Sequence, residues 1–221
     1  AVLGRFTADR NRSVLRVPLG ERRRALEEIP WVEQASVERI LPNRIRVQLT
    51  ERTPVAFLRL GRELALVDAR GIILDRPLEG DFRFPVVAGI SESMLRSEIE
   101  QRMKLYVEFL KEIELIRPGA ADTVSEVDLS DARDLCATLE PMPALGLLQS
   151  EGENPVLVHF GDTDFTNKFG TFVENISQWR ASTGRVESVD LRFARQVVVN
   201  PENGATASRA LKRSEGAVRS R

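Results

Sequence analysis

Few side chains in this sequence could perform acid–base or nucleophilic chemistry. The chain has one histidine, His159, and one cysteine, Cys136, so any Ser/His/Asp or Cys/His site would have to use His159. His159 alternates with Val156 and Val158, as is typical of a strand, and Cys136 lies in the apolar run 135–139. These settings predict a structural histidine and a small buried core residue rather than a catalytic base and a reactive thiol.

Sequence motifs that bind phosphate or metal are also missing. The sequence has no Walker A motif, no GxGxxG and no CxxC. Asp162 and Asp164 are similar to the start of a calcium loop, but Asn167 stands where that loop requires glycine and Val173 where it requires glutamate. Capping of a helix by Asp164 is the better interpretation. The sequence therefore predicts no catalytic residue, no metal site and no cofactor.

The composition indicates a globular protein without a strong net electrostatic field. Hydrophobic residues make up 42% and charged residues 29% of 221 residues, and the formal net charge is -1. This length permits one large domain or two small ones, of which two are preferred, and the charge provides no attraction to nucleic acid or anionic membrane. No apolar run approaches the about 18 residues of a membrane helix, and residues 1–12 lack the pattern of a signal peptide.

The stretch 29–57 organises the first part of the chain. It predicts a strand, a Pro-Asn turn and a second strand, in which Ile45, Val47 and Leu49 alternate with polar residues as in a half-buried strand. A helix is expected over 18–29, because proline suits the first helical position and disfavours helix in the residue before it. The result is a helix–strand–strand unit.

After Pro54 the pattern changes to short strands separated by turns that contain glycine. A helix is expected over 91–115, with Ser91 or Ser93 as its N-cap. A second helix follows Asp164, and its apolar stripe is better explained by core packing than by a hydrophobic ligand site. The stripe consists of Phe165, Phe169, Phe172, Val173, Ile176 and Trp179. Strands are expected over 55–60, 63–67, 72–74, 124–129, 135–139, 156–160, 186–193 and 196–199. This is an α+β chain with a mostly antiparallel sheet and two packed helices.

The last residues, 201–221, are small, polar and basic, and they show no periodicity. We expect a disordered basic tail. Contact of its basic residues with anionic lipid or nucleic acid is the alternative, but no aromatic residue is interleaved for base stacking. The basic residues are Arg209, Lys212, Arg213, Arg219 and Arg221.

Taken together, these residues resemble the bacterial cell-division family FtsQ/DivIB. The strongest part is Ile29-Pro30-Trp31-Val32, Ala35, Val37, Leu41-Pro42-Asn43, Ile45, Val47, Glu51-Arg52-Thr53-Pro54-Val55-Ala56 and Leu66-Val67-Asp68-Ala69-Arg70-Gly71. Weaker landmarks are Val127-Asp128-Leu129, Lys168-Phe169 and Val189-Asp190-Leu191-Arg192-Phe193. Their order and spacing carry the resemblance, since no single tripeptide is diagnostic.

The resemblance implies a single-pass type II protein of the inner (cytoplasmic) membrane, located at the division septum, with this portion outside the cytoplasm. It implies a POTRA domain over 1–53 and a β domain over 54–200. The first POTRA strand and most of the first POTRA helix are missing, and residues 1–6 read as the end of a helix. We therefore expect the chain to be a fragment, with a membrane anchor upstream of Ala1.

The resemblance also implies a non-enzymatic scaffold that recruits and regulates septal cell-wall synthesis by binding FtsB and FtsL, FtsB being the principal partner. Other divisome proteins would bind the POTRA domain. The final strand is expected at a sheet edge, where a partner strand could add. Phe193 takes the place of a partner-contacting tyrosine of the family, and Arg133 that of an arginine that pairs with a partner carboxylate. The candidate partner-binding residues are Phe193, Arg195, Gln196, Val197, Val198, Val199 and Arg133.

Several alternatives accompany these expectations. Phe193 could belong to the core, and Arg133 could be an ordinary solvated arginine. The whole chain could instead belong to a POTRA-containing chaperone, or to a secretion or outer-membrane assembly protein. Such proteins share the helix–strand–strand unit but usually carry tandem POTRA repeats, and no internal repeat is visible in this sequence. An enzyme is the third reading, and the inventory of side chains disfavours it.

Overall fold

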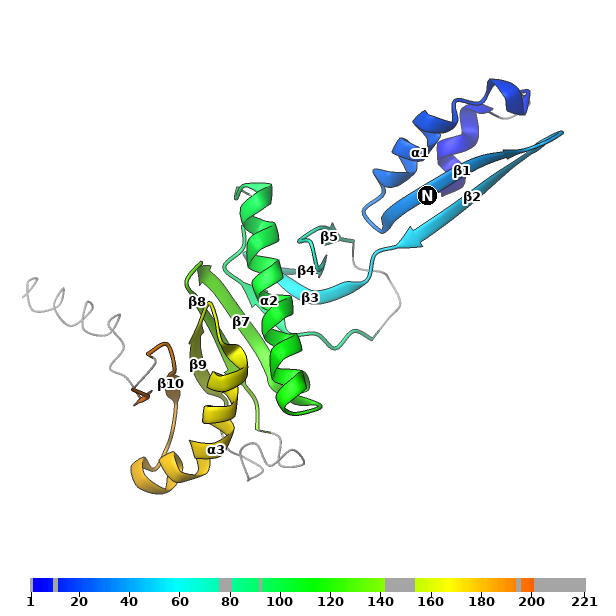
Figure 1. The fold of residues 1–221 in the computed structure, drawn as a ribbon. Coiled ribbons are helices and arrows are strands. Elements are labelled where there is room, and N and C mark those ends of the chain that lie inside the picture. Colours follow the sequence, from blue (N-terminus) through cyan, green and yellow to red (C-terminus); the bar gives the residue numbers. More distant parts are fainter. Residues whose placement is uncertain are drawn as a thin grey trace, which may run out of the picture. The chain divides into compact units, whose positions relative to one another are not determined.

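The computed structural model describes residues 2–9, 12–75, 81–91, 93–141, 154–193 and 196–200. The chain forms two compact units, 1–104 and 105–221, and the boundary between them falls within helix α2 (Figure 1). The basic tail predicted over 201–221 lies outside the described residues.

A helix and a long hairpin open the first unit (Figure 1). Val37 lies opposite Val47 in the antiparallel pair of β1 and β2. A small core of Leu26, Val32 and Ala35 is buried between helix and hairpin, and Val37, Val47 and Leu49 pack against it. The predicted alternation and the helix–strand–strand unit are therefore confirmed. The elements are η1 (Val2–Asp9), η2 (Val14–Arg16), α1 (Leu19–Glu27), β1 (Val32–Ile40) and β2 (Arg44–Glu51).

A second group of strands follows directly in this unit. β3 pairs with β4 and β4 with β5 in antiparallel fashion, whereas β6 is parallel to β3. Gly71, with φ of 76°, connects β4 to β5, and a Cβ at this position would lie 2.3 Å from Cγ2 of Ile99 on α2. The strands are β3 (Pro54–Leu60), β4 (Glu63–Asp68), β5 (Ile73–Leu74) and β6 (Val86–Ala88). The first three lie close to the predicted ranges.

Helix α2 spans Arg96–Ile116 and starts five residues later than predicted from Ser91. The expected N-cap was wrong, because the hydroxyls of Ser91 and Ser93 lie 2.9 Å apart and hydrogen-bond to each other. The helical hydrogen bonds begin instead at Leu95, whose carbonyl accepts from the backbone N–H of Ile99 at 3.1 Å.

The sheet of the second unit has the strand order β11-β10-β9-β8-β7. Its pairings are antiparallel except for β9 with β10, which are parallel. The predicted strand over 186–193 is shorter in the structure, because the side chain of Asp190 accepts the backbone N–H of Arg192 and turns the chain. The elements are η3 (Ala120–Thr123), β7 (Val124–Asp131), β8 (Asp134–Leu139), β9 (Val156–Gly161), β10 (Ser188–Asp190) and β11 (Val198–Val199).

Helix α3 (Phe165–Thr183) packs its aromatic stripe against one face of this sheet. Phe165, Phe169, Phe172 and Ile176 are at most 1% exposed, and the rings of Phe165 and Phe160 lie 6.5 Å apart. The stripe is therefore core, as predicted. Mainly antiparallel strands with packed helices confirm the α+β class.

The N-terminus of α3 is capped from another helix. Asp164 occupies the N-cap position with φ of 61°, but its side chain caps no backbone N–H; it accepts from the amide of Asn167 at 2.6 Å. Glu112 of α2 takes the capping role, since its Oε2 accepts both the backbone N–H and the hydroxyl of Thr166 at 2.9 Å. The predicted cap by Asp164 was therefore wrong in its contacts.

Candidate functional site

The C-terminal strand lies at the end of the strand order, as expected for an edge. β11 pairs with β10, with Val189 opposite Val199 and Asp190 opposite Val198, and none of the described residues adds a strand on its other side. The strand covers only Val198–Val199, so it is shorter than the predicted 196–199. Gln196 is exposed and Val197 half-buried ahead of it, while Arg195 lies outside the described residues.

The hydrogen-bond pattern shows which backbone groups of the edge are free to pair. The backbone N–H of Asn200 donates to the carbonyl of Ser188 at 2.8 Å. Because antiparallel strands alternate hydrogen-bonded with non-hydrogen-bonded pairs, Val198 faces β10, and the backbone groups of Val199 face away from it. Val199 therefore presents an N–H and a C=O at the open edge.

Asn200 fixes the end of this strand, a role that was not predicted from the sequence. Its side-chain oxygen accepts the backbone N–H of Glu187 at 2.7 Å and that of Ser188 at 3.2 Å. Its amide donates to the carbonyl of Arg185 at 2.8 Å. Asn200 adopts φ of 49°, a conformation that asparagine tolerates better than most residues. That preference was the only signal in the sequence.

Phe193 lies outside the core. Its side chain is 55% exposed, and the guanidinium carbon of Arg192 lies 5.9 Å from the centre of its ring, within range of a cation–π contact. The alternative of core packing is therefore wrong, and Phe193 presents an aromatic surface close to the edge strand.

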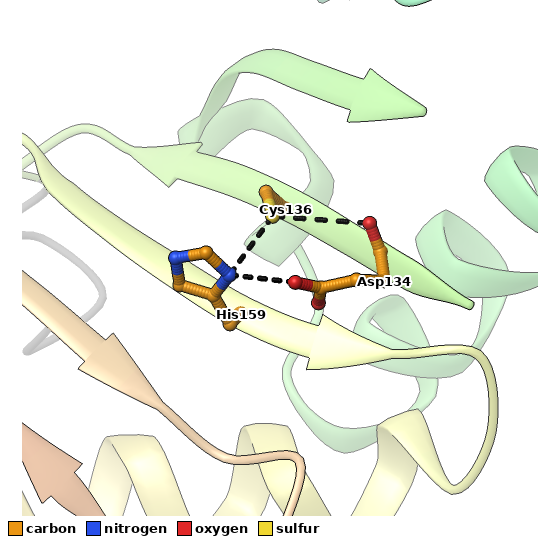
Figure 2. A group of neighbouring side chains, drawn as sticks. All are labelled: Asp134, Cys136 and His159. Atoms are coloured by element: carbon orange, nitrogen blue, oxygen red, sulfur yellow. Dashed lines mark hydrogen bonds and ion pairs between the residues drawn. The ribbon is translucent and has the colours of Figure 1, made fainter. Parts of the chain in front are cut away.

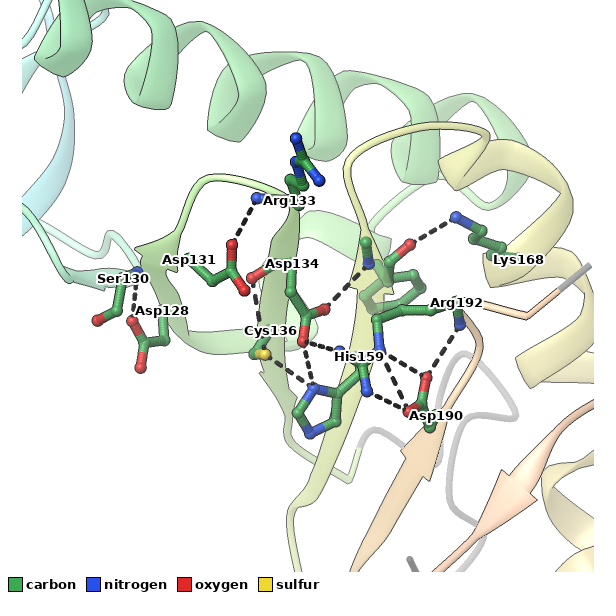
Figure 3. Close-up of polar contacts among 12 residues, drawn as sticks. Asp128, Ser130, Asp131, Arg133, Asp134, Cys136, His159, Lys168, Asp190 and Arg192 are labelled. Carbon is green, nitrogen blue, oxygen red and sulfur yellow. Dashed lines mark hydrogen bonds and ion pairs between the residues drawn. The ribbon is translucent and has the colours of Figure 1, made fainter. Parts of the chain in front are cut away.

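Arg192 ties the segment that carries Phe193 to two buried carboxylates (Figure 3). Its Nη1 donates to Oδ2 of Asp134 on β8 at 3.0 Å, and its Nε donates to Oδ1 of Asp190 at 3.0 Å. Asp134 is 7% exposed and Asp190 5%. The other oxygen of Asp134 accepts the backbone N–H of Gly161 at 3.2 Å. A single side chain thus links β8 to the chain that leaves β10.

The opposite charges of Asp190 and Arg192 stabilise each other. Burial alone would raise the pKa of Asp190, but hydrogen bonds and the positive charge of Arg192 outweigh burial and hold the pKa below its usual value. The hydrogen bonds to Asp190 in turn raise the pKa of Arg192. Both groups are therefore charged at neutral pH.

Next to this network, His159 and Cys136 face each other across β8 and β9 (Figure 2). Nδ1 of His159 lies 2.8 Å from Oδ2 of Asp134 and 3.1 Å from the sulfur of Cys136. Burial, followed by the charge of Asp134, raises the pKa of the Cys136 thiol to about 12. The thiol is thus protonated at neutral pH and is a poor nucleophile.

The prediction that Cys136 is a buried core residue was wrong, because the side chain is only half-buried. Its neighbours Leu135 and Ala137 are fully buried, and side chains alternate between the two faces of a strand. Cys136 therefore points to the face opposite the core. The expected structural role of His159 agrees with its hydrogen bonds.

Arg133 lies in the turn between β7 and β8, where its backbone N–H donates to Oδ1 of Asp131 at 2.9 Å (Figure 3). Its side chain is exposed and forms no ion pair with any residue that the structure describes. Arg133 precedes Asp134, and Phe193 follows Arg192. The Asp134–Arg192 ion pair therefore brings the two predicted contact residues to the same end of the sheet.

Two family models match the chain. POTRA domain, FtsQ-type, matches residues 4–52, and Cell division protein FtsQ/DivIB, C-terminal, matches residues 56–192. The second match includes Asp134, His159 and Arg192 and ends just before Phe193. None of the helices among the described residues has the length and apolar character needed to cross a membrane.

Curated relatives agree with these matches. A protein of Koribacter versatilis named Cell division protein FtsQ is 39% identical over 206 residues, which cover 92% of this chain and 56% of the relative. Proteins of the same name from Syntrophotalea carbinolica and Geotalea daltonii are 26% and 25% identical, and the matches cover 81% and 77% of this chain and 60% and 58% of those relatives. The chain thus spans somewhat more than half the length of these relatives.

Proposed function

The chain belongs to the FtsQ/DivIB family of cell division proteins, and we propose that it is a non-enzymatic divisome scaffold that binds FtsB, together with FtsL, by strand addition at β11. Recruitment and regulation of septal cell-wall synthesis would follow from that binding. The observation that supports the proposal best is the open edge of β11 beside the exposed ring of Phe193.

Strand addition at this edge has a clear physical basis. An edge strand presents backbone N–H and C=O groups that a partner segment can use, so that main-chain hydrogen bonds supply affinity and side-chain contacts supply selectivity. Asn200 holds the end of β11 in place before any partner arrives. A preorganised edge loses less conformational entropy on binding than a mobile one.

The side chains proposed for partner contact differ in their roles. Phe193 would be the aromatic anchor, since exposed aromatic rings near the centre of an interface dominate binding energies. Arg133 would pair with a carboxylate of the partner at the rim, where charge pairs add selectivity more than affinity. Gln196, Val197, Val198 and Val199 would line the added strand, and Arg195 belongs to the same proposed set.

The domain division and the location are also part of this proposal. The POTRA domain would cover 1–53 and bind other divisome proteins, and the β domain would cover 54–200. The whole protein would be anchored in the inner membrane by a single helix, with this portion on the extracytoplasmic side at the septum. A POTRA-type chaperone or secretion function receives no support from the matches to FtsQ-type domains.

The test measures the affinity of a peptide from the C-terminal region of FtsB for the chain. Val199→Pro removes an N–H that faces the open edge, and Val199→Ala is its control, because alanine keeps that N–H. Phe193→Ala is compared with Leu115→Ala, a truncation of another exposed apolar side chain, 74% exposed, on α2.

We expect Val199→Pro and Phe193→Ala each to weaken binding by about tenfold or more, while both controls bind like the wild type. Circular dichroism verifies that each variant is folded. Unchanged affinity in folded Val199→Pro would rule out strand addition at β11. Equal losses of affinity in Phe193→Ala and Leu115→Ala would contradict the proposed role of Phe193 as the aromatic anchor.

A further inference from the structure

Three side chains of types that can bind a metal converge on the face of the β7–β11 sheet that is opposite the buried Leu135 and Ala137 (Figure 2). The ligand atoms that Asp134, Cys136 and His159 can offer all lie within 4.8 Å of one another. We propose that these side chains form a binding site for a zinc-like divalent metal ion, with the fourth coordination position open to water. This proposal goes beyond partner binding at β11 and does not depend on it.

The types of donor atom suit such an ion. Zinc binds imidazole nitrogen, thiolate sulfur and carboxylate oxygen, and three protein ligands with one open position form one of its common arrangements. A site with a thiolate and an imidazole favours zinc and similar borderline-soft metals over magnesium or calcium, which prefer oxygen ligands alone.

The distances are close to those of an assembled site. Nδ1 of His159 lies 2.8 Å from Oδ2 of Asp134 and 3.1 Å from the sulfur of Cys136. In a tetrahedral site with bonds of about 2.0–2.3 Å, ligand atoms stand roughly 3.3–3.7 Å apart. Small rotations of the side chains would therefore admit the ion, without movement of the backbone.

Paired strands hold the three ligands in position. Cys136 lies directly opposite His159 in the register of β8 and β9, and Asp134 is two residues before Cys136 on the same strand. The second oxygen of Asp134 accepts the backbone N–H of Gly161, which orients the carboxylate toward the other ligands. Outer hydrogen bonds of this kind raise metal affinity.

The surrounding charges favour a cation at this position. Asp128 on β7 lies opposite Cys136, and Asp190 on β10 lies opposite His159. The guanidinium of Arg192 supplies a positive charge next to these carboxylates, and its Nη1 lies 3.0 Å from Oδ2 of Asp134. A metal ion would compete with Arg192 for Asp134, and Arg192 would keep its hydrogen bonds to Asp190.

Coordination also requires the movement of protons. The thiol of Cys136 would release its proton to solvent and bind as thiolate. The imidazole of His159 would bind through Nδ1 and carry its proton on Nε2, so that it remains neutral. Thiolate and carboxylate together then balance the two positive charges of the ion.

Cobalt(II) is the direct probe, because it replaces zinc and absorbs light when a thiolate binds it. The chain contains one cysteine and one histidine, so in the untagged 221-residue chain a thiolate-to-cobalt charge-transfer band can arise only from Cys136. We expect this band to saturate at one cobalt per chain and to disappear on addition of zinc. Absence of the band in the wild type would overturn the proposal, and this measurement requires no variant.

Variants test the other ligands. His159→Gln and Asp134→Asn should each weaken cobalt binding by about tenfold or more, whereas Asp131→Asn, which changes an exposed carboxylate at the end of β7, should leave it unchanged. Arg192→Gln should strengthen binding by roughly tenfold, since a divalent ion about 6 Å from a single positive charge is repelled by that amount even in water. Equal affinity in wild type and Cys136→Ala would indicate adventitious binding and contradict the proposal.

Discussion

The carboxylate of Asp134 and the guanidinium of Arg192 lie 3.0 Å apart, although 58 residues separate them in the sequence. This ion pair joins the start of β8 to the segment that follows β10. It also sets the positions of Arg133 and Phe193, each of which is adjacent in sequence to one member of the pair. The positions of these two candidate partner-binding residues therefore depend on the Asp134–Arg192 ion pair.

Phe193→Ala should leave the stability of the chain almost unchanged. The side chain is 55% exposed, and surface truncations usually change the free energy of unfolding by less than about 0.5 kcal/mol. Urea denaturation of wild type and variant measures the difference. A loss of several kcal/mol would mean that the ring supports the fold, and the proposed binding role would then need another test residue.

Asp190 should make the stability depend on pH in the acid range. The pKa of this carboxyl is below its usual value in the folded chain, so its contribution is fully present above the unfolded pKa of about 3.9 and is lost as the pH falls through the lower folded pKa. Asp190→Asn removes this contribution. The urea midpoints of wild type and variant should differ most at neutral pH and approach each other toward about pH 2; a constant difference would contradict the expected linkage.

Glu112→Ala should destabilise the fold by about 1 kcal/mol, because the N-terminus of α3 loses its cap. The carboxylate accepts two hydrogen bonds from Thr166. Glu108→Ala, an exposed glutamate one turn earlier on α2, is the matched control and should be near neutral. Thermal unfolding followed by circular dichroism compares the two variants, and equal melting temperatures would argue against capping by Glu112.

Gly71→Ala should be more damaging than Gly61→Ala. Both glycines have positive φ, but a Cβ at Gly71 would lie 2.3 Å from Ile99, whereas nothing lies within 4 Å of a Cβ at Gly61. We expect a loss of about 1 kcal/mol at Gly61 from the backbone alone and at least roughly 2 kcal/mol at Gly71, where overpacking adds to it. Chemical denaturation measures the free energy of unfolding of both variants. Similar losses of stability would show that α2 shifts at Ile99 to make room for the added methyl group.

Local patterns predicted much of the fold. Val47 and Leu49, two of the alternating apolar residues of the second strand, do pack against the small core on one side of the hairpin. The spacing of Phe165, Phe169 and Phe172 placed these side chains in the core. In each case neighbouring residues contain the whole signal, because the period of a strand or helix is visible within a few residues.

The features that were missed depend on distant residues. Glu112 caps α3 through Thr166, which lies 54 residues further along the chain. Asp134, His159 and Arg192 meet only after β8, β9 and β10 have paired in register. Strand periodicity places His159 in a strand but does not indicate its cross-strand neighbours. The end of β10 was missed for a local reason: the side chain of Asp190 accepts the backbone N–H of Arg192, two residues later, and turns the chain.

The four hydrogen bonds of Asn200 give the C-terminal edge a mechanical property. Its side chain and backbone N–H hold residues 185–188, immediately after the two-residue strand β11. A pulling force applied to the chain beyond residue 200 would therefore be transmitted to the segment 185–188 before it reached β11. We therefore expect these hydrogen bonds to shield the proposed binding edge from tension in the sequence that follows it.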